Sequence, residues 1–297
     1  MPAVPTVRLA KYHGLGNDFL VSIVAAGENA PDDAEHAALA RAACDRHRGI
    51  GADGLMVCAP SPDSDADLVM RLRNADGSLA EMSGNGIRCF VHAAIDAGMV
   101  WPGIVRVRTD GGLRTVVANA PDERGVVQVQ VSMGAIELDA IPIPESVRSR
   151  LGARRAVSVN VGNPHLVVEA DIASVDLYRF GPDIEEWYLT TELRGINVEV
   201  VEHSADGDSL NMAVWERGVG ITQACGTGAV ATAAAANRWG MSGLRTKVVQ
   251  PGGEATVVLS GGEATLIGPS QFVCVAELPG LRHNWARGRN APWPRLR

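Results

Sequence analysis

Ser83-Gly84-Asn85-Gly86, followed by residues 87–99, is the stretch around which the rest of the chain is organised. Apolar side chains recur at intervals of three and four from Ile87 to Ile95, which predicts a helix with one buried face. Gly98 stands where a C-terminal cap would end that helix. The stretch therefore predicts a glycine turn that opens directly into a helix.

A second copy of this pattern begins at Cys225-Gly226-Thr227-Gly228 and continues through residues 229–241. Its helix is apolar nearly all round over residues 229–236, which predicts burial on every side. Cys225, Gly240 and Met241 each follow their counterparts by 142 residues, and the pairs Gly16-Asn17 and Gly162-Asn163 are 146 residues apart. This nearly constant spacing indicates two halves built on the same supersecondary unit.

The start of each predicted helix suits an anion. The first N–H groups of a helix lack internal partners, the macrodipole is positive there, and glycine lets an anion approach the backbone closely. A cysteine at such a position is expected to have a lowered pKa. One such motif alone is more often a plain turn. The matched pair predicts that both helix starts bind one carboxylate, with Ser83 and Cys225 on opposite faces of its α-carbon to remove and return a proton.

Composition narrows the class of protein. The 297 residues suffice for two domains, and 46% hydrophobic with 21% charged residues is typical of a globular chain. A net charge of −7 gives no electrostatic support for nucleic-acid binding. Five cysteines without paired spacing predict a reducing, cytoplasmic setting, and no metal motif or membrane-length apolar run occurs. We expect a small-molecule substrate, no metal and no membrane partner, and leave a homodimer open.

Residues 49–54 match G-x-G-x-x-G, but a dinucleotide-binding role is rejected. That fingerprint must follow a strand and open a helix. Here a helix predicted over residues 34–47, capped by Asp32 or Asp33, precedes the glycines, and the apolar run 55–59 follows them. The order predicts a tight helix-to-strand loop.

The remaining patterns alternate between short strands and turns. Strands are predicted at residues 7–10, 20–24, 55–59, 68–72, within 101–118 and 125–133, and at 166–169, 196–201, 211–215, 248–259 and 263–267. We place an N-terminal half at residues 1–126, to which residues 269–280 return, and a C-terminal half at 127–268. A basic tail at 281–297 is expected to be a frayed, disordered terminus.

Eight short motifs, in order from residue 13 to residue 228, resemble those of diaminopimelate epimerase. They are His13-Gly-Leu-Gly-Asn-Asp-Phe19, Arg48-Gly-Ile-Gly-Ala-Asp-Gly54, Asn74-Ala-Asp-Gly-Ser78, Ser83-Gly-Asn-Gly-Ile-Arg-Cys89, Gly162-Asn-Pro-His165, Asn197-Val-Glu199, Trp215-Glu-Arg217 and Ala224-Cys-Gly-Thr-Gly228. The resemblance implies epimerisation of LL- to meso-2,6-diaminoheptanedioate in lysine biosynthesis, without a cofactor. It also implies an α/β (α+β) fold of two pseudo-symmetric halves, each a curved, mostly antiparallel sheet around a central helix, with the active site in the cleft between them.

The resemblance also implies roles for individual residues. Cys225 matches one of the two catalytic cysteines, and Ser83 occupies the position of the other. His165 and Glu216 match residues that position the catalytic thiols and the reacting amine. The residues that match substrate contacts are Asn17, Asn74, Gly84, Asn85, Asn163, Asn197, Glu216, Arg217, Gly226 and Thr227, of which Arg217 suits the distal carboxylate because its guanidinium can bind it bidentately.

Two positions depart from the family pattern. Ser83 stands where the first catalytic cysteine is usual, and Gly54 stands where some members have a glutamine that contacts substrate. A serine hydroxyl is a far weaker acid than a thiol, so three functions stay open. They are epimerisation with a Ser/Cys pair, epimerisation or one-base elimination on another amino acid, and binding of a diamino acid without turnover. Cys89 is predicted to belong to the core.

Overall fold

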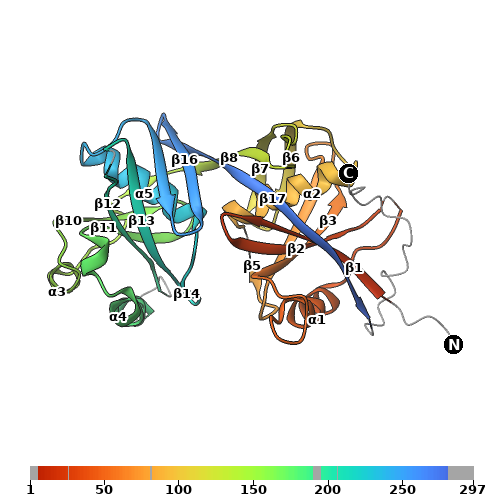
Figure 1. Cartoon of the computed structure of the whole chain (residues 1–297), viewed down its shortest axis with the longest axis horizontal. Coiled ribbons are helices and arrows are strands. Elements are labelled where there is room, and N and C mark those ends of the chain that lie inside the picture. Colours follow the sequence, from red (N-terminus) through yellow and green to blue (C-terminus); the bar gives the residue numbers. More distant parts are fainter. Residues whose placement is uncertain (1–5, 26, 81, 190–194, 206, 280–297) are drawn as a thin grey trace. The chain divides into compact units, whose positions relative to one another are not determined.

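The computed structural model describes residues 6–25, 27–80, 82–189, 195–205 and 207–279. The backbone packs as two compact units: unit 1 is Met1–Val131 with Pro269–Arg297, and unit 2 is Ser132–Gly268. The chain passes from unit 1 to unit 2 within β8 (Val127–Ala135) and back within β17 (Glu263–Pro279) (Figure 1). The predicted tail at 281–297 lies outside the described residues.

Unit 1 is a curved sheet with two helices, α1 (Asp33–Cys44) and α2 (Gly84–Asp96). Its strands pair in the order β17-β1-β2-β3-β4-β6-β7-β8; β2–β3 and β4–β6 are parallel and the other pairings with printed registers are antiparallel. The strands besides β8 and β17 are β1 (Thr6–Gly14), β2 (Asn17–Ile23), β3 (Gly54–Pro60), β4 (Leu68–Asn74), β5 (Leu79–Ala80), β6 (Gly103–Thr109) and β7 (Gly112–Ala118).

Unit 2 repeats this arrangement. Its strands pair in the order β9-β10-β11-β12-β13-β15-β16-β17, again with two parallel pairings, β11–β12 and β13–β15. The strands are β9 (Glu137–Leu138), β10 (Arg155–Asn160), β11 (Pro164–Glu169), β12 (Asn197–His203), β13 (Ser209–Glu216), β14 (Gly220–Ile221), β15 (Arg245–Gln250) and β16 (Gly253–Ser260). The helices are α3 (Glu145–Arg150), the 3-10 turn η1 (Ile172–Ser174), α4 (Leu177–Leu189) and α5 (Gly226–Arg238).

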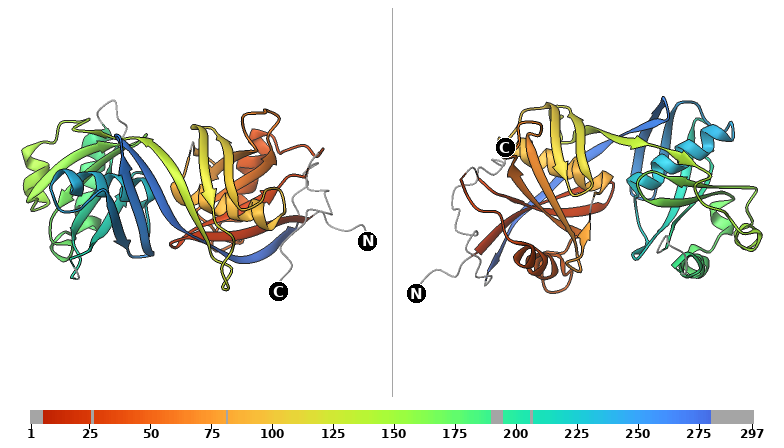
Figure 2. Two further views of the ribbon diagram at one scale, coloured as in Figure 1. Left: turned by 90° about the horizontal axis from the view of Figure 1, so that it is seen from above. Right: turned by 180° about the vertical axis from the view of Figure 1, so that it is seen from behind.

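The same succession of antiparallel and parallel pairings in both units confirms the predicted fold of two pseudo-symmetric halves. From β1 and from β10 the pairings run antiparallel, parallel, antiparallel, parallel and antiparallel. In each unit the fourth strand also carries a two-residue antiparallel strand, β5 or β14. Each sheet curves around one helix: α2 packs on β1, β2 and β3, and α5 packs on β10, β11, β12 and β16 (Figure 2).

The central helices begin and end in the same way. Ser83 and Cys225 are the N-caps, both in extended backbone conformation. At the other end, Gly98 and Gly240 have φ of +69° and +73°. The N–H groups of Met99 and Met241 reach back to the carbonyls of Ala94 and Ala236, which is the Schellman arrangement. Both predicted helices and both predicted glycine caps are therefore confirmed.

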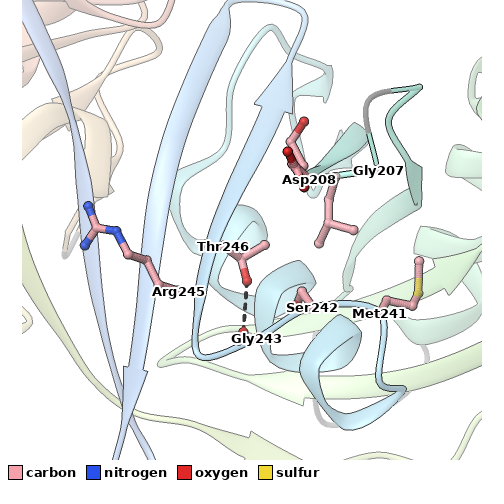
Figure 3. Close-up of a pocket in the computed structure, with 9 residues that line it drawn as sticks. Gly207, Asp208, Met241, Ser242, Gly243, Arg245 and Thr246 are labelled. Atoms are coloured by element: carbon pink, nitrogen blue, oxygen red, sulfur yellow. Dashed lines mark hydrogen bonds between the residues drawn. The ribbon is translucent and has the colours of Figure 1, made fainter.

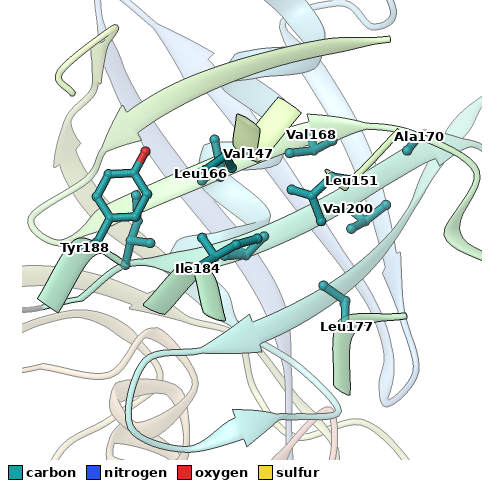
Figure 4. Close-up of a cluster of buried hydrophobic side chains, with 11 residues drawn as sticks. Val147, Leu151, Leu166, Val168, Ala170, Leu177, Ile184, Tyr188 and Val200 are labelled. Carbon is teal, nitrogen blue, oxygen red and sulfur yellow. The ribbon is translucent and has the colours of Figure 1, made fainter. Parts of the chain in front are cut away.

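Burial of apolar side chains holds each unit together. In unit 2, α3 packs through Val147, and α4 packs through Ile184 and Tyr188. These side chains lie against Leu166 and Val200 of the sheet (Figure 4). In unit 1, α1 covers β1, β2 and β3 through a second buried cluster that includes Leu39 and Leu55. Helix α5 buries almost every residue from Gly226 to Ala236, because its small side chains let strands approach from all sides.

Three local features differ from the sequence predictions. Helix α1 ends at Cys44 and not at His47, because the Asp45 side chain accepts the backbone N–H groups of His47 and Arg48 and turns the chain. Helix α3 was not predicted, since it has only six residues and no side-chain cap. Strand β17 continues through Pro269 to Pro279, well beyond the predicted strand at 263–267, because its second part pairs with β1.

Candidate active site

The two helix starts place a hydroxyl and a thiol in equivalent positions. Ser83 Oγ accepts the Gly86 N–H at 3.0 Å, and Cys225 Sγ accepts the Gly228 N–H at 3.3 Å. Each glycine is required by close packing: a Cβ on Gly86 would lie 3.0 Å from Ser83 Cβ, and one on Gly228 would lie 2.7 Å from Glu199 Oε1. The Gly-x-Gly pattern thus reflects steric need as well as backbone access for an anion.

Behind the Ser83 turn, amides are fixed by a hydrogen-bonded chain within unit 1. Asn85 Nδ2 donates to Asn17 Oδ1 at 3.2 Å, and Asn17 Nδ2 donates to Asp53 Oδ2 at 2.6 Å. The Arg46 guanidinium binds both Asp53 and Asp18 at 2.7 Å. The predicted substrate residues Asn17 and Asn85 are therefore in contact, and charged groups behind them set their orientation.

Arg88 is a functional candidate that the sequence reasoning missed. Its side chain is fully buried, and none of the described residues forms an ion pair with it. The guanidinium donates to Asn85 Oδ1 at 2.8 Å, to the Gly84 carbonyl at 3.3 Å and to the Pro269 carbonyl at 3.3 Å. Burial lowers the pKa of Arg88 to about 10, so the group keeps its positive charge at neutral pH beside the anion-binding turn.

Asn74 and Gly54 are two further positions of unit 1 at which family members are expected to contact substrate. Asn74 is the last residue of β4, and its Nδ2 donates to Ser78 Oγ across the following turn at 3.0 Å. Gly54 faces the Arg73 carbonyl closely, so a Cβ there would lie only 2.8 Å from that oxygen. A glutamine at residue 54 would therefore require β3 and β4 to move, which explains why this chain has glycine.

Around Cys225, side chains from α5, β11 and the turn before β11 form a continuous set of contacts. Cys225 Sγ lies 3.5 Å from Thr227 Oγ1, which lies 3.5 Å from Asn163 Nδ2. Asn163 Oδ1 is 3.0 Å from His165 Nε2. The structure thus brings together four of the residues predicted from the sequence.

Glu199 extends this set and was not among the predicted site residues. Its Oε1 lies 2.6 Å from His165 Nδ1, and both side chains have no exposed surface. The position of Glu199 beside Cys225 could not be predicted from the residue type alone. Its contact with His165 arises from the parallel pairing of β11 with β12. The sequence offered two hints, since Glu199 ends the Asn197-Val-Glu199 motif and interrupts the apolar run 198–201.

The pKa of Cys225 is raised, which corrects the expectation of a lowered value. Burial is the main cause, and the negative charges of Glu216 and Glu199 act in the same direction. The Gly228 N–H and the Thr227 hydroxyl oppose the rise without reversing it. The helix start is therefore outweighed by desolvation and two carboxylates, and Cys225 is a neutral thiol at neutral pH.

The carboxyl group of Glu216 is the best candidate for accepting a proton from the Cys225 thiol. Burial raises its pKa, while hydrogen bonds with Thr222 and Cys225 lower it. A carboxyl with a raised pKa beside a thiol is a suitable partner for proton exchange with that thiol. The predicted positioning role of Glu216 therefore has a chemical basis in this contact.

Asn197 and Arg217 are joined to one another. Asn197 Oδ1 accepts the Arg217 backbone N–H at 2.9 Å, and Asn197 Nδ2 donates to the Pro164 carbonyl at 3.3 Å. Glu185 of α4, also missed from the sequence, accepts from Trp215 Nε1 and from the Gly218 N–H, both at 2.8 Å. These contacts hold the segment 215–218 from both sides.

One surface hollow of unit 2 has a volume of about 230 Å³ and is formed by Gly207–Leu210, Met241–Gly243, Arg245 and Thr246 (Figure 3). None of the predicted site residues lines it. Thr246 Oγ1 donates to the Gly243 carbonyl at 3.0 Å, and the Arg245 side chain points away from the other labelled residues. The hollow offers no converging charged groups.

The described residues contain no group of three or more His, Cys, Asp or Glu side chains placed to hold a metal ion. None of the described helices is long and apolar enough to cross a membrane. All five cysteines are free thiols, and Cys89 is fully buried, as predicted for a core residue.

Comparison with known proteins connects this geometry to one family. The family model described as diaminopimelate epimerase matches residues 9–138 and 157–273. The diaminopimelate epimerase of Thermobifida fusca is 40% identical, over 92% of this chain and 98% of its own. That of Methanocella arvoryzae is 38% identical, over 92% and 96% respectively.

Solved structures with lower sequence identity share the fold. A phenazine biosynthesis protein of the PhzF family from Bacillus anthracis has a TM-score of 0.70 at 15% identity, over 92% of this chain and 99% of its own. A hydroxyproline epimerase from Agrobacterium vitis, with trans-4-hydroxy-L-proline bound, has a TM-score of 0.67 at 19% identity, over 94% and 92%. These likenesses concern the arrangement of strands and helices.

Proposed function

The chain belongs to the diaminopimelate epimerase family, and from that premise we propose that Cys225 and Ser83 are its two proton-transfer residues. It is an isomerase that interconverts LL- and meso-2,6-diaminoheptanedioate in lysine biosynthesis. One side chain removes the α-proton and the other returns a proton to the opposite face. The observation that carries this assignment is the shared N-cap geometry of Ser83 and Cys225.

The substrate carboxylate at the reacting carbon is bound by the backbone N–H groups of Gly84-Asn85 and Gly226-Thr227. These N–H groups lie in the first turns of α2 and α5, at the positive end of each helix dipole. The buried charge of Arg88 supports anion binding at the first of these turns. As the planar carbanion forms, negative charge spreads onto this carboxylate, so donors there stabilise the transition state more than the ground state.

The distal end of the substrate is recognised by Arg217 and by amide side chains. Arg217 binds the distal carboxylate, and Asn17, Asn74, Asn163 and Asn197 orient the distal amino-acid group. Asn197 contributes by fixing the Arg217 backbone, since its Oδ1 and one Nδ2 hydrogen are already used. Glu216 exchanges a proton with Cys225 and contacts the reacting amine.

Ser83 favours one alternative chemistry. A hydroxyl is a much weaker acid than a thiol, so Cys225 could exchange the α-proton alone, without inversion. Such one-base exchange would incorporate deuterium from heavy water but leave the product as the LL isomer. Stereochemical analysis of the product therefore separates one-base exchange from epimerisation.

The free thiols support a reducing, cytoplasmic setting for this reaction. The test of the proposed function is an assay of the purified protein with LL-2,6-diaminoheptanedioate, in which formation of the meso isomer is followed by chiral separation. We expect conversion in both directions without added cofactor. Absence of meso product together with absence of α-deuterium incorporation would overturn the proposal and leave binding without turnover.

A further inference from the structure

Glu199 and His165 form a fully buried pair beside the proposed catalytic thiol. They lie on neighbouring parallel strands, β12 and β11, and Nδ1 of His165 is 2.6 Å from Oε1 of Glu199. The second oxygen, Oε2, is buried and has no hydrogen-bond partner among the described residues. Leaving a carboxylate oxygen unpaired in the interior is costly. An apolar strand residue would avoid that cost, so stability does not explain this pair.

The contacts on either side of the imidazole fix where its protons are. Asn163 directs Nδ2 toward Thr227 Oγ1 and Oδ1 toward His165 Nε2, at 3.5 and 3.0 Å. An amide oxygen only accepts hydrogen bonds, so Nε2 carries a hydrogen. The contact of Nδ1 with Oε1 requires a second hydrogen between those two atoms. The pair as a unit therefore holds two protons, and His165 cannot accept another at Nε2.

This pair is linked to Cys225 by packing and by charge. Glu199 Oε1 fills the space that a side chain on Gly228 would need, and the Gly228 N–H donates to Cys225 Sγ. The ionisable groups that face the thiol are Glu216 from β13 and Glu199 from β12, with His165 from β11 paired to Glu199. The negative charge of Glu199 raises the pKa of Cys225.

We propose that Glu199 is a positioning residue of the epimerase reaction, which keeps both ring nitrogens of His165 protonated so that His165 holds Asn163 and Thr227 against the Cys225 thiol. The inference rests on the proposed role of Cys225. It makes His165 a hydrogen-bond donor and not the base that deprotonates Cys225. That task is left to Glu216.

The first experiment replaces the carboxylate by an amide of the same shape, Glu199→Gln. The matched control is Glu202→Gln on the same strand, because Glu202 accepts the Ile172 N–H and contacts no proposed site residue. We expect Glu199→Gln to lower kcat about tenfold or more with KM nearly unchanged, since supporting contacts typically contribute at that level. The pH profile of kcat/KM should also change, because the variant removes both the charge of Glu199, which raises the pKa of Cys225, and the proton that Glu199 keeps on His165. Glu202→Gln should change neither quantity.

A second measurement is made on wild-type protein and does not depend on turnover. Nitrogen NMR of wild-type protein with isotope-labelled histidine, with the His165 signal assigned by its loss in His165→Gln, should show two protonated ring nitrogens at neutral pH. A bare ring nitrogen would overturn the inference, as would a Glu199→Gln variant with wild-type kcat and pH profile. Failure of the proposed function would appear differently, as wild-type protein without activity on the diamino diacid.

Discussion

At the scale of single residues, the two proposed proton-transfer groups, Ser83 and Cys225, share a backbone role but not an electrostatic environment. Ser83 begins α2 next to Gly84, whose carbonyl accepts from the buried cation of Arg88. Cys225 begins α5 among the carboxylates of Glu216 and Glu199. Positive charge helps the weaker acid, the hydroxyl, to give up a proton, while negative charge keeps the stronger acid, the thiol, protonated.

Ser83→Cys tests whether the hydroxyl site accepts a thiol. Cys225 itself shows that a cysteine fits this N-cap, with Sγ accepting the third helical N–H at 3.3 Å. We therefore expect Ser83→Cys to keep or raise kcat in an assay of meso product formation. Ser83→Ala, the control that removes the proton-transfer group, should lower kcat by about a hundredfold or more. Loss of most activity in Ser83→Cys would mean that the site requires a hydroxyl.

The raised pKa of Cys225 leads to a prediction about its reaction with iodoacetamide. The thiolate is the reactive form, so alkylation of Cys225 in wild type should increase with pH only in alkaline solution. Glu216→Gln removes a negative charge and should move the midpoint of alkylation to lower pH. Mass spectrometry of the Cys225 peptide separates this signal from that of the half-exposed Cys274. An unchanged midpoint would show that Glu216 does not act on the thiol.

At the scale of elements, local chemistry made most of the fold predictable. The glycine caps of α2 and α5 and the aspartate cap of α1 each depend on neighbouring residues only, and the structure confirms them. The site was predictable where residues stand in recognisable motifs, as at Asn163, His165 and Cys225. Glu199 and Arg88 were missed because their importance comes from buried contacts with Gly228, His165 and Pro269 that no sequence spacing reveals.

The two glycine caps predict a matched pair of stability changes. Gly98 and Gly240 have positive φ and open space where a Cβ would be, so Gly→Ala adds backbone strain without a clash. We expect each substitution to lower the free energy of unfolding by about 1–2 kcal/mol. Gly243→Ala is the control, because Gly243 also has open space but no positive φ. Urea denaturation followed by circular dichroism gives the three values, and equal midpoints for all three variants would refute the strain account.

At the scale of the whole molecule, the chain forms the same strand topology twice, and its strand β17 then pairs with the first strand, β1. The equivalent of β8 in the second repeat is β17, which completes the unit 2 sheet at Glu263–Ile267 and then pairs with β1 in unit 1. Pro269 and Ser270, at the crossing, accept or share hydrogen bonds with the buried Arg88 and His92 of α2. The packing of unit 1 therefore depends on the second part of β17, which follows unit 2 in the sequence.

Removal of that returning segment should unfold unit 1 selectively. A chain that ends after Gly268 loses the partner of β1 from Thr6 to His13 and removes one hydrogen-bond partner each from the buried Arg88 and His92. A chain that ends after Pro279 keeps every described strand and serves as control. Limited proteolysis with mapping of the fragments should show rapid cleavage within unit 1 of the shorter chain alone. Equal protection of both chains would contradict this dependence.

The central claim is that Cys225, with a second group on the opposite face, exchanges the α-proton of a diamino diacid. Its most direct test is incubation with LL-2,6-diaminoheptanedioate in heavy water, with deuterium at the α-carbon and the configuration of that carbon measured together. We predict that wild-type protein yields meso product labelled at the inverted carbon and that Cys225→Ala yields neither label nor inversion. Labelled meso product from Cys225→Ala at the wild-type rate would contradict the account.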